Sequence, residues 1–264
     1  MTPLAHANDA ADLSPATGSG RDGGCSATEL LTGRTAYCNK SPAAIVSLAI
    51  SAELGTMRAV TGYGKPLREQ DVKADPLSQF AIWYRDAGAT GARLPEAAAL
   101  ATASADGAPS LRMVLVKGFD ERGFVFFSNY ASLKGRELAI NPRAALLFYW
   151  DSLGRQVRIT GPVEHTSSTE SHTYVRSRPR ESQLSALASP QSQTIESRLA
   201  LEQRATELKQ RFGDGELPLP TNWGGFRLAI ETVEFWQQRH DRLHDRLRYR
   251  RGDSADWVVE RLAP

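Results

Sequence analysis

Three nitrogen-rich side chains near the C-terminal end of the sequence have the spacing of a binding surface. Arg242, His244 and Arg246 occupy alternate positions, so an extended backbone would project them from one face. Leu243 and Leu247 would then point to the opposite side, toward a core. Grouping cationic side chains on one face is costly unless an anion meets them. The segment is typical either of an anion site or of a solvated basic edge strand.

Four further cations in the middle of the sequence are candidates for binding phosphate: Arg112, Lys117, Lys134 and Arg178. The sequence has no glycine-rich phosphate loop between a strand and a helix, so side chains would have to hold any phosphate. Arginine suits that role because its planar fork donates two parallel hydrogen bonds. Arg112 also adjoins the apolar run Met113–Val116 instead of lying in a polar loop.

A smaller group with phosphate-binding chemistry surrounds Pro179. Tyr174 and Arg178 are four residues apart on a predicted helix, and Ser182 follows the proline break. Two hydroxyls and a guanidinium near a new helix N-terminus suit a monoester phosphate. Capping by Ser182 and packing by Tyr174 explain the same residues, so both interpretations stay open.

Several neutral side chains are suited to contacting a heterocyclic ligand. Gln156, Gln191 and Ser192 can donate to and accept from the edge of a heterocycle, although turn and cap roles explain them equally well. Trp223 and Trp236 can stack on an aromatic ligand or be buried in a core. These residues alone do not separate the two possibilities.

Composition and the remaining motifs argue against several classes of protein. With 32 basic and 30 acidic residues, a net charge of +2 and 41% hydrophobic residues, we expect a soluble globular protein without a nucleic-acid or membrane partner. No apolar run approaches the roughly 20 residues of a transmembrane helix. We predict no metal site, because His240 and His244 have ligand spacing only on a helix and their segment is predicted to be a strand or loop. A serine hydrolase is also not expected, because the sequence has no G-x-S-x-G motif. Cys25 and Cys38 are predicted to be reduced thiols in the cytoplasm.

The sequence divides into three parts by composition. Residues 1–56 are predicted to be a disordered extension, because most of them are small or polar without hydrophobic periodicity. Residues 57–74 form an N-terminal arm, and Met57 is either the true translation start or lies inside a longer chain. Residues 75–264 carry the folded domain, including C-terminal dimerisation strands.

Closely spaced strand patterns predict a mainly β fold with peripheral helices, more typical of a barrel than of a doubly wound sheet. Asp75 and Pro76 predict a helix start, and Ser132 predicts another that ends before Pro142. Three more helices are predicted over 167–178, 180–188 and 194–212. The predicted strands cover 97–103, 110–119, 124–130, 144–150, 156–164, 225–236, 246–250 and 257–262.

Taken in order, a series of short segments resembles the pyridoxine (pyridoxamine) 5′-phosphate oxidase family. The resemblance covers Leu67–Pro264 and ends in the tail Arg261–Pro264. The matching segments are Arg112–Lys117, Phe127–Asn129, Arg155–Val157, Ser177–Gln183, Pro218–Pro220, Trp223–Gly225, Glu234–Gln237 and Arg242–Arg246.

The resemblance implies a split β-barrel homodimer that binds FMN at the subunit interface. Lys117, Tyr174, Arg178 and Ser182 then resemble the substrate-phosphate cluster. Arg242 and His244 resemble the catalytic pair over the pyridine ring, and Trp223 is left with a structural role. The implied flavin-binding residues are Arg112, Met113, Val114, Leu115, Val116, Lys117, Phe127, Ser128, Lys134, Gln156, Gln191, Ser192, Trp236 and Arg246.

The implied reaction is oxidation of pyridoxine 5′-phosphate or pyridoxamine 5′-phosphate to pyridoxal 5′-phosphate. A hydride would leave C4′ for flavin N5, and O2 would reoxidise the flavin to give hydrogen peroxide. Arg242 would orient the substrate, and His244 would hold that geometry or move a proton.

Two departures from the family pattern bear on this expectation. Leu133 stands where the family often carries another arginine, and Arg58 and Tyr63 match the family's N-terminal arm only loosely. Two alternatives remain: a related split-barrel flavoprotein with another substrate, and a carrier that binds pyridoxal phosphate without turnover. The first should lack Arg178, Ser182 and the Arg242/His244 pair, all of which are present here.

Overall fold

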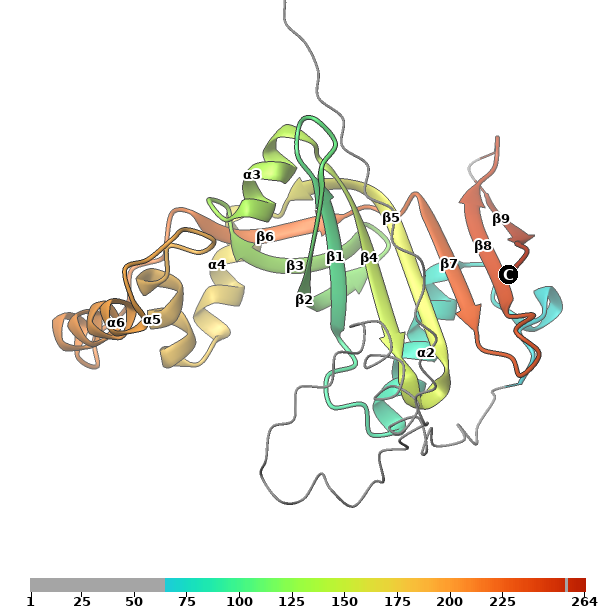
Figure 1. The fold of residues 1–264 in the computed structure, drawn as a ribbon, viewed down its shortest axis with the longest axis horizontal. Coiled ribbons are helices and arrows are strands. Elements are labelled where there is room, and N and C mark those ends of the chain that lie inside the picture. The colour runs from blue at the N-terminus through green and yellow to red at the C-terminus, as the bar shows by residue number, and fades with distance from the viewer. Residues whose placement is uncertain (1–64, 255) are drawn as a thin grey trace, which may run out of the picture. The chain divides into compact units, whose positions relative to one another are not determined.

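The computed structural model describes residues 65–254 and 256–264 (Figure 1). The predicted extension over 1–56 and residues 57–64 of the predicted arm lie outside the described residues, as do both cysteines and Arg58 and Tyr63. The described end of the arm lies against the C-terminal strands. There Arg261 donates to the Leu67 carbonyl oxygen at 2.8 Å and pairs with Glu69 at 2.7 Å.

The described chain folds into nine strands with helices around them. The strands are β1 (Ala97–Ala103), β2 (Pro109–Asp120), β3 (Gly123–Asn129), β4 (Arg143–Trp150), β5 (Arg155–His165), β6 (Trp223–Leu228), β7 (Thr232–Gln237), β8 (Asp245–Arg251) and β9 (Trp257–Arg261). The helices are η3 (Glu69–Asp71), α2 (Pro76–Ala89), α3 (Leu133–Ile140), η4 (Asp151–Leu153), α4 (Ser168–Ser177), α5 (Arg180–Ala188) and α6 (Arg198–Phe212). None of these helices is both long enough and apolar enough to cross a bilayer.

The sheet closes into a barrel and continues beyond it. Its order is β4-β1-β2-β3-β6-β5-β7-β8-β9, and a further pairing of β4 with β5 closes six of the strands into a ring. All paired strands are antiparallel, and short turns join neighbours such as β1 and β2, which only antiparallel pairing allows. The predicted mainly β split barrel with peripheral helices is therefore confirmed.

Helix α2 supplies a large part of the barrel core. Asp75 caps it by accepting from the Ser78 amide at 2.8 Å, and Pro76 occupies the first turn, as predicted. Phe80 on this helix is fully buried, and its ring lies 4.8–5.0 Å from those of Phe119, Phe124 and Phe148. These edge-to-face contacts join the helix to three strands.

Strand β5 is the junction between the barrel and its extension. It pairs with β7 over residues 155–160 and with β6 over residues 163–165. Gly161 lies at the crossing, where an added Cβ would overlap the carbonyl oxygen of Ala229. The single strand predicted over 225–236 is therefore wrong. The chain bends at 229–231, because β6 and β7 pair with different parts of β5.

The predicted common face of Arg242, His244 and Arg246 is also wrong. Strand β8 begins only at Asp245, and Arg242 adopts the left-handed conformation with φ +61°. The Asp241 carboxylate accepts from the Leu243 amide at 3.0 Å and builds a tight turn. Leu243 is consequently 66% exposed instead of entering the core, whereas Leu247 is buried as expected.

The helical section agrees with the sequence pattern except at one start. Ser167 accepts from the Glu170 amide at 3.1 Å and caps α4, and Arg178 ends that helix before Pro179. Helix α6 starts at Arg198, later than the predicted 194, because Ser197 is its N-cap. No residue of α6 is buried, and Leu199 is 60% exposed.

We predict that Gly161→Ala destabilises the fold by about 1–3 kcal/mol. The added methyl group would overlap the backbone carbonyl of Ala229, which cannot move away without disturbing the strands around it. Chemical denaturation in urea measures this change. Gly118→Ala is the matched control, since a Cβ there has no neighbour within 4 Å. Equal free energies of unfolding for both variants would contradict the role assigned to the crossing.

Candidate active site

Three of the predicted cations line one cavity, which we call the cation pocket. Lys117 comes from β2, Lys134 from α3, and Arg178 from the end of α4. The pocket has a volume of about 240 Å³, and no carboxylate is among its lining residues. Its other lining residues are Met113, Val114, Leu115, Phe127, Ser128, Tyr174, Gln191 and Trp223.

Arg178 has the clearest unmet requirement for an anion. Its Nη1 atom is buried without a hydrogen-bond partner, and no other side-chain nitrogen or oxygen in the described chain is in that state. Burial lowers the pKa of this guanidinium, and Tyr174 acts in the opposite direction. A buried donor without an acceptor is costly, and the cost is largest for a charged group. A phosphate oxygen would satisfy it.

Lys134 is a second buried cation surrounded by neutral acceptors. Its ammonium donates to Gln191 Oε1 at 2.9 Å, to Ser128 Oγ at 3.2 Å and to Ser132 Oγ at 3.4 Å. Burial lowers the pKa of Lys134, the charge of Arg112 lowers it further, and Glu137 acts in the opposite direction. The fold thus brings Lys134 together with Phe127, Ser128 and Gln191, which the family resemblance also places among the flavin-binding residues.

Arg112 lies behind the pocket in a network that the sequence reasoning missed. Its guanidinium donates to Glu137 at 3.3 Å and to the hydroxyls of Ser110 and Thr102. The Glu137 carboxylate is buried and also accepts from Ser110 at 2.6 Å. The one available signal was its position three residues after Lys134 on a predicted helix, which places both on one face. Glu137 thereby fixes α3 and Arg112 relative to each other.

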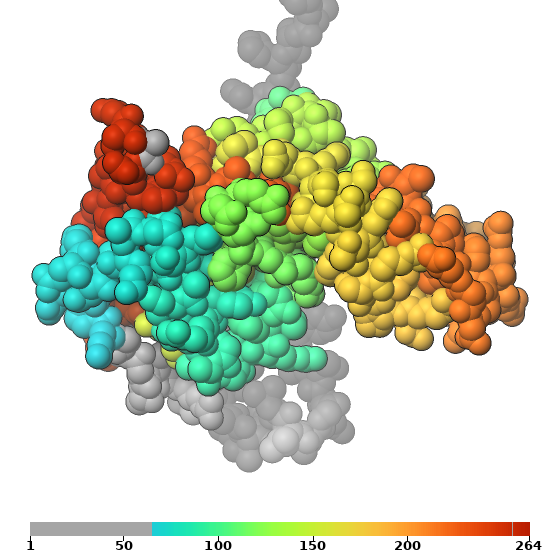
Figure 2. Space-filling view, turned by 180° about the vertical axis from the view of Figure 1, so that it is seen from behind, coloured from blue at the N-terminus to red at the C-terminus, as the bar shows by residue number. Residues whose placement is uncertain are grey.

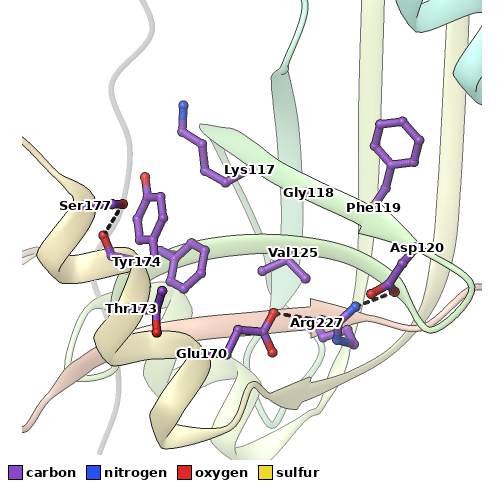
Figure 3. A pocket seen from close by; sticks show the side chains of 11 residues that line it. Lys117, Gly118, Phe119, Asp120, Val125, Glu170, Thr173, Tyr174, Ser177 and Arg227 are labelled. Atoms are coloured by element: carbon purple, nitrogen blue, oxygen red, sulfur yellow. Dashed lines mark hydrogen bonds and ion pairs between the residues drawn. The ribbon is translucent and has the colours of Figure 1, made fainter.

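A larger cavity of about 470 Å³ adjoins the cation pocket and shares Lys117, Phe127 and Tyr174 with it (Figure 3). At its floor Arg227 pairs with Asp120 at 2.6 Å and with Glu170 at 2.8 Å. Figure 3 shows the polar ends of Lys117 and Tyr174 directed to the same side, away from these ion pairs. Arg227 therefore holds two carboxylates apart from the cation pocket.

A second group of predicted residues gathers on the extended sheet, and we call it the sheet-face cluster. Gln156, Trp236 and Arg246 are paired in one row across β5, β7 and β8. The His244 ring lies 4.7 Å from that of Trp236, and its Nδ1 accepts from the Arg239 amide at 3.1 Å. A neutral His244 therefore carries its proton on Nε2, where it can donate to a ligand. Arg246 is held by Glu234 at 2.8 Å, which raises its pKa.

Within one chain, the two groups stay apart. None of Gln156, Trp236, Arg242, His244 and Arg246 is among the residues that line the cation pocket. Figures 1 and 2 place β7 and β8 on one side of the barrel and α4 and α5 on the other. Ser182, Ser192 and Val116 do not line the pocket either. Ser182 lies in the first turn of α5, Ser192 is exposed with φ 68°, and Val116 is buried in the core.

Fold and pocket together define a class, a split β-barrel protein with a cation-lined pocket for an anionic ligand. Residues 85–212 match the family model described as pyridoxamine 5′-phosphate oxidase. Residues 223–264 match the pyridoxine 5′-phosphate oxidase C-terminal dimerisation region. The chain belongs to the pyridoxine/pyridoxamine 5′-phosphate oxidase family.

Relatives and solved structures agree with that assignment. The chain is 54% identical over 198 residues to a pyridoxine/pyridoxamine 5′-phosphate oxidase of Bordetella avium, covering 75% of this chain and 93% of the relative. It is 58% identical over 192 residues to one of Frankia alni, covering 71% and 80%. The crystal structure of PhzG from Burkholderia lata, in complex with tetrahydrophenazine-1-carboxylic acid, superposes with a TM-score of 0.72 at 34% identity. That match covers 77% of this chain and 100% of PhzG.

We predict that Glu137→Gln lowers the free energy of unfolding at neutral pH by about 1–3 kcal/mol, the range for disturbing a buried charged hydrogen-bond network. Burial acts to raise the pKa of Glu137, but hydrogen bonds from Ser110 and Thr102 and the charge of Arg112 bring it below its ordinary value. The stabilisation is therefore fully present above the unfolded-state pKa of about 4.3, and it is lost as pH falls through the lower folded-state pKa.

Urea denaturation across pH 3–7 checks this prediction, with the exposed Glu207→Gln on α6 as the control. The difference between wild type and Glu137→Gln should shrink toward the acid end. A difference that stays constant with pH would contradict the assignment of a charged Glu137.

Proposed function

We propose that this protein oxidises pyridoxine 5′-phosphate and pyridoxamine 5′-phosphate to pyridoxal 5′-phosphate, with FMN as cofactor and O2 as the final acceptor. The observation that carries the proposal is the cation pocket of a family member, in which the buried Nη1 of Arg178 lacks an acceptor. FMN, when bound, would supply the acceptor for the hydride from C4′ and the route of the electrons to O2, which becomes hydrogen peroxide; with the amine substrate, water would replace the nitrogen, which leaves as ammonia. We place the enzyme in the cytoplasm.

The residues of the pocket fit a flavin phosphate. Lys134, Ser128 and Gln191 already form a buried donor and acceptor set, and Arg112 lies close enough to lower the pKa of Lys134. These residues would hold the phosphate, while Phe127 and the Met113–Lys117 edge of β2 would lie along the rest of the cofactor. The phosphate dianion would replace some of the neutral oxygens that now accept from Lys134, because an anion is a better partner for a buried ammonium.

A different part of the pocket would bind the substrate phosphate. Arg178 and Lys117 supply charge, and Tyr174 supplies a hydroxyl. Burial raises the pKa of Tyr174, although Arg178 acts in the opposite direction, so the hydroxyl stays protonated near neutral pH and can donate. Ser182, in the first turn of α5, would complete the cluster. Arg242 and His244 would orient the pyridine ring, His244 donating from Nε2.

The sheet-face cluster would reach the cation pocket in a homodimer. Between the cation pocket and the sheet-face cluster, the sheet exposes an apolar face. On this face Leu111 is 70%, Met113 64% and Tyr149 54% exposed. Alanines of β1 separate the large side chains, because Ala99 pairs with both Met113 and Leu147. Such a face favours burial against another protein surface. A second copy of the chain would cover it and bring its own Trp236, Arg242, His244 and Arg246 to the pocket.

We predict that two inactive variants restore activity when combined. Co-expression of Arg178→Ala and Arg242→Ala chains gives heterodimers in which one site carries both changes and the other carries none. About a quarter of wild-type turnover should return, because about half of the dimers are mixed and each has one intact site. Tagged subunits allow the mixed dimer to be isolated. Absence of any recovery in that dimer would show that each site lies within one chain.

We predict that Leu133→Arg tightens FMN binding by about tenfold, within the ~1–3 kcal/mol of a charge-assisted hydrogen bond. Leu133 precedes Lys134 and is 44% exposed at the first turn of α3, next to the proposed flavin phosphate. Quenching of flavin fluorescence by the apoprotein measures the dissociation constant. Ile140→Arg, at the exposed other end of the same helix, controls for added charge. An equal effect of both variants would contradict the proposed position of the phosphate.

The direct test of function is formation of pyridoxal 5′-phosphate from pyridoxine 5′-phosphate in air by protein supplied with FMN. Product accompanied by hydrogen peroxide is the expected result. A yellow protein that forms no product would instead favour the related flavoprotein with another substrate. Binding of pyridoxal phosphate without oxygen-dependent turnover would favour a carrier.

A further inference from the structure

We infer that Trp223 is a positioning residue for the substrate phosphate, holding the Arg178 guanidinium and the Tyr174 ring in place. This inference rests on the proposed function and deepens it. The family resemblance leaves Trp223 with only a structural role, yet the structure places it in the lining of the cation pocket. It is half-buried and does not belong to the barrel core.

The Arg178 guanidinium packs over the ring of Trp223. The Cζ atom of Arg178 lies 4.7 Å from the centre of the indole ring, within the range of a cation–π interaction. Within the described chain no carboxylate forms an ion pair with Arg178, and its buried Nη1 has no acceptor. The indole face therefore orients the cation without consuming the hydrogen-bond donor that a phosphate needs.

The same tryptophan also aligns Tyr174. The rings of Trp223 and Tyr174 are parallel within 2° at 6.1 Å, and Phe127 lies within 14° of both. Phe127 and Tyr174 are stacked at 3.8 Å. Since a stacked phenol cannot swing freely, the direction of the Tyr174 hydroxyl is set by this group of rings. Trp223 thus orients Arg178 directly and belongs to the group of rings that orients Tyr174.

The backbone holds Trp223 in turn. It is the first residue of β6 and pairs with Asn129 of β3. The next two residues are glycines, and a Cβ on Gly224 would overlap the Tyr130 hydroxyl, whereas one on Gly225 would overlap Thr166. The Trp-Gly-Gly motif therefore lets β6 approach β3 and α4 closely and presents a fixed indole face to the pocket.

The test compares Trp223→Leu, which removes the aromatic face, with Trp223→Phe, which keeps one. Phe212→Leu is the control, because Phe212 carries Arg211 at 5.3 Å at the end of α6, and no residue of that helix is buried or lines the cation pocket. The FMN-loaded enzymes are assayed for KM and kcat with pyridoxine 5′-phosphate and for inhibition by inorganic phosphate. Direct titration with pyridoxal 5′-phosphate and with pyridoxal is independent of turnover.

For Trp223→Leu, KM and the inhibition constant of inorganic phosphate should rise about tenfold, with kcat changed much less. Binding of pyridoxal 5′-phosphate should weaken similarly, while binding of pyridoxal should not change. Trp223→Phe should recover most of the loss, and Phe212→Leu should resemble wild type. Loss of kcat at constant KM, equal weakening for pyridoxal, or failure of the Phe variant to recover would overturn the inference.

The titration separates this inference from the proposed function. A wild-type protein that binds pyridoxal 5′-phosphate but does not oxidise its reduced forms would refute the oxidase activity. Trp223 would still be supported if the phosphate-dependent part of that binding is lost in Trp223→Leu. A wild-type protein that binds pyridoxal and pyridoxal 5′-phosphate equally would overturn the role of Trp223.

Discussion

Positive charge that is only partly compensated inside the cation pocket is the constraint on which the rest of the site depends, since Lys117 alone of its three cations forms an ion pair within the described residues, with Glu96 at 3.4 Å. Lys117, Lys134 and Arg178 meet there without a lining carboxylate, and one guanidinium nitrogen lacks any acceptor. Nearby acids are occupied elsewhere, Glu137 with Arg112 and Glu170 with Arg227. The fold thus keeps carboxylates away from Lys134 and Arg178, the two cations of the pocket for which no ion pair is found in the described chain. An anionic ligand is the partner that the buried Lys134 and the buried Nη1 of Arg178 require.

The second constraint is the division of the site between two surfaces of one chain. The barrel positions the cation pocket beside α3 and α4, whereas β7 and β8 carry the sheet-face cluster on the extension. Arg246 in that cluster is already paired with Glu234, so it can stay ordered without a ligand. Because of this division, a second copy of the chain, packed on the apolar sheet face, would be needed to bring the sheet-face cluster to the cation pocket.

Local signals in the sequence predicted much of this structure, while long-range contacts escaped it. The caps at Asp75, Ser132 and Ser167 act within one turn and were read correctly. The bend between β6 and β7 depends on the crossing at Gly161, which is distant in sequence. The local pattern over 225–236 contains no signal for that bend, so it predicted a single strand. The cations of the pocket were identified by residue type and resemblance. The roles of Glu137 and Trp223 depend on burial and ring geometry, which only the folded chain defines.

The central claim is that one site is built from two copies of the chain around a shared flavin. Sedimentation velocity of the FMN-loaded protein, recorded where only flavin absorbs and over a wide dilution series, tests it most directly. We predict that flavin absorbance sediments only with the dimer, and that dilution to monomers releases free FMN. Flavin that stays bound to a sedimenting monomer, with unchanged affinity, would contradict the account.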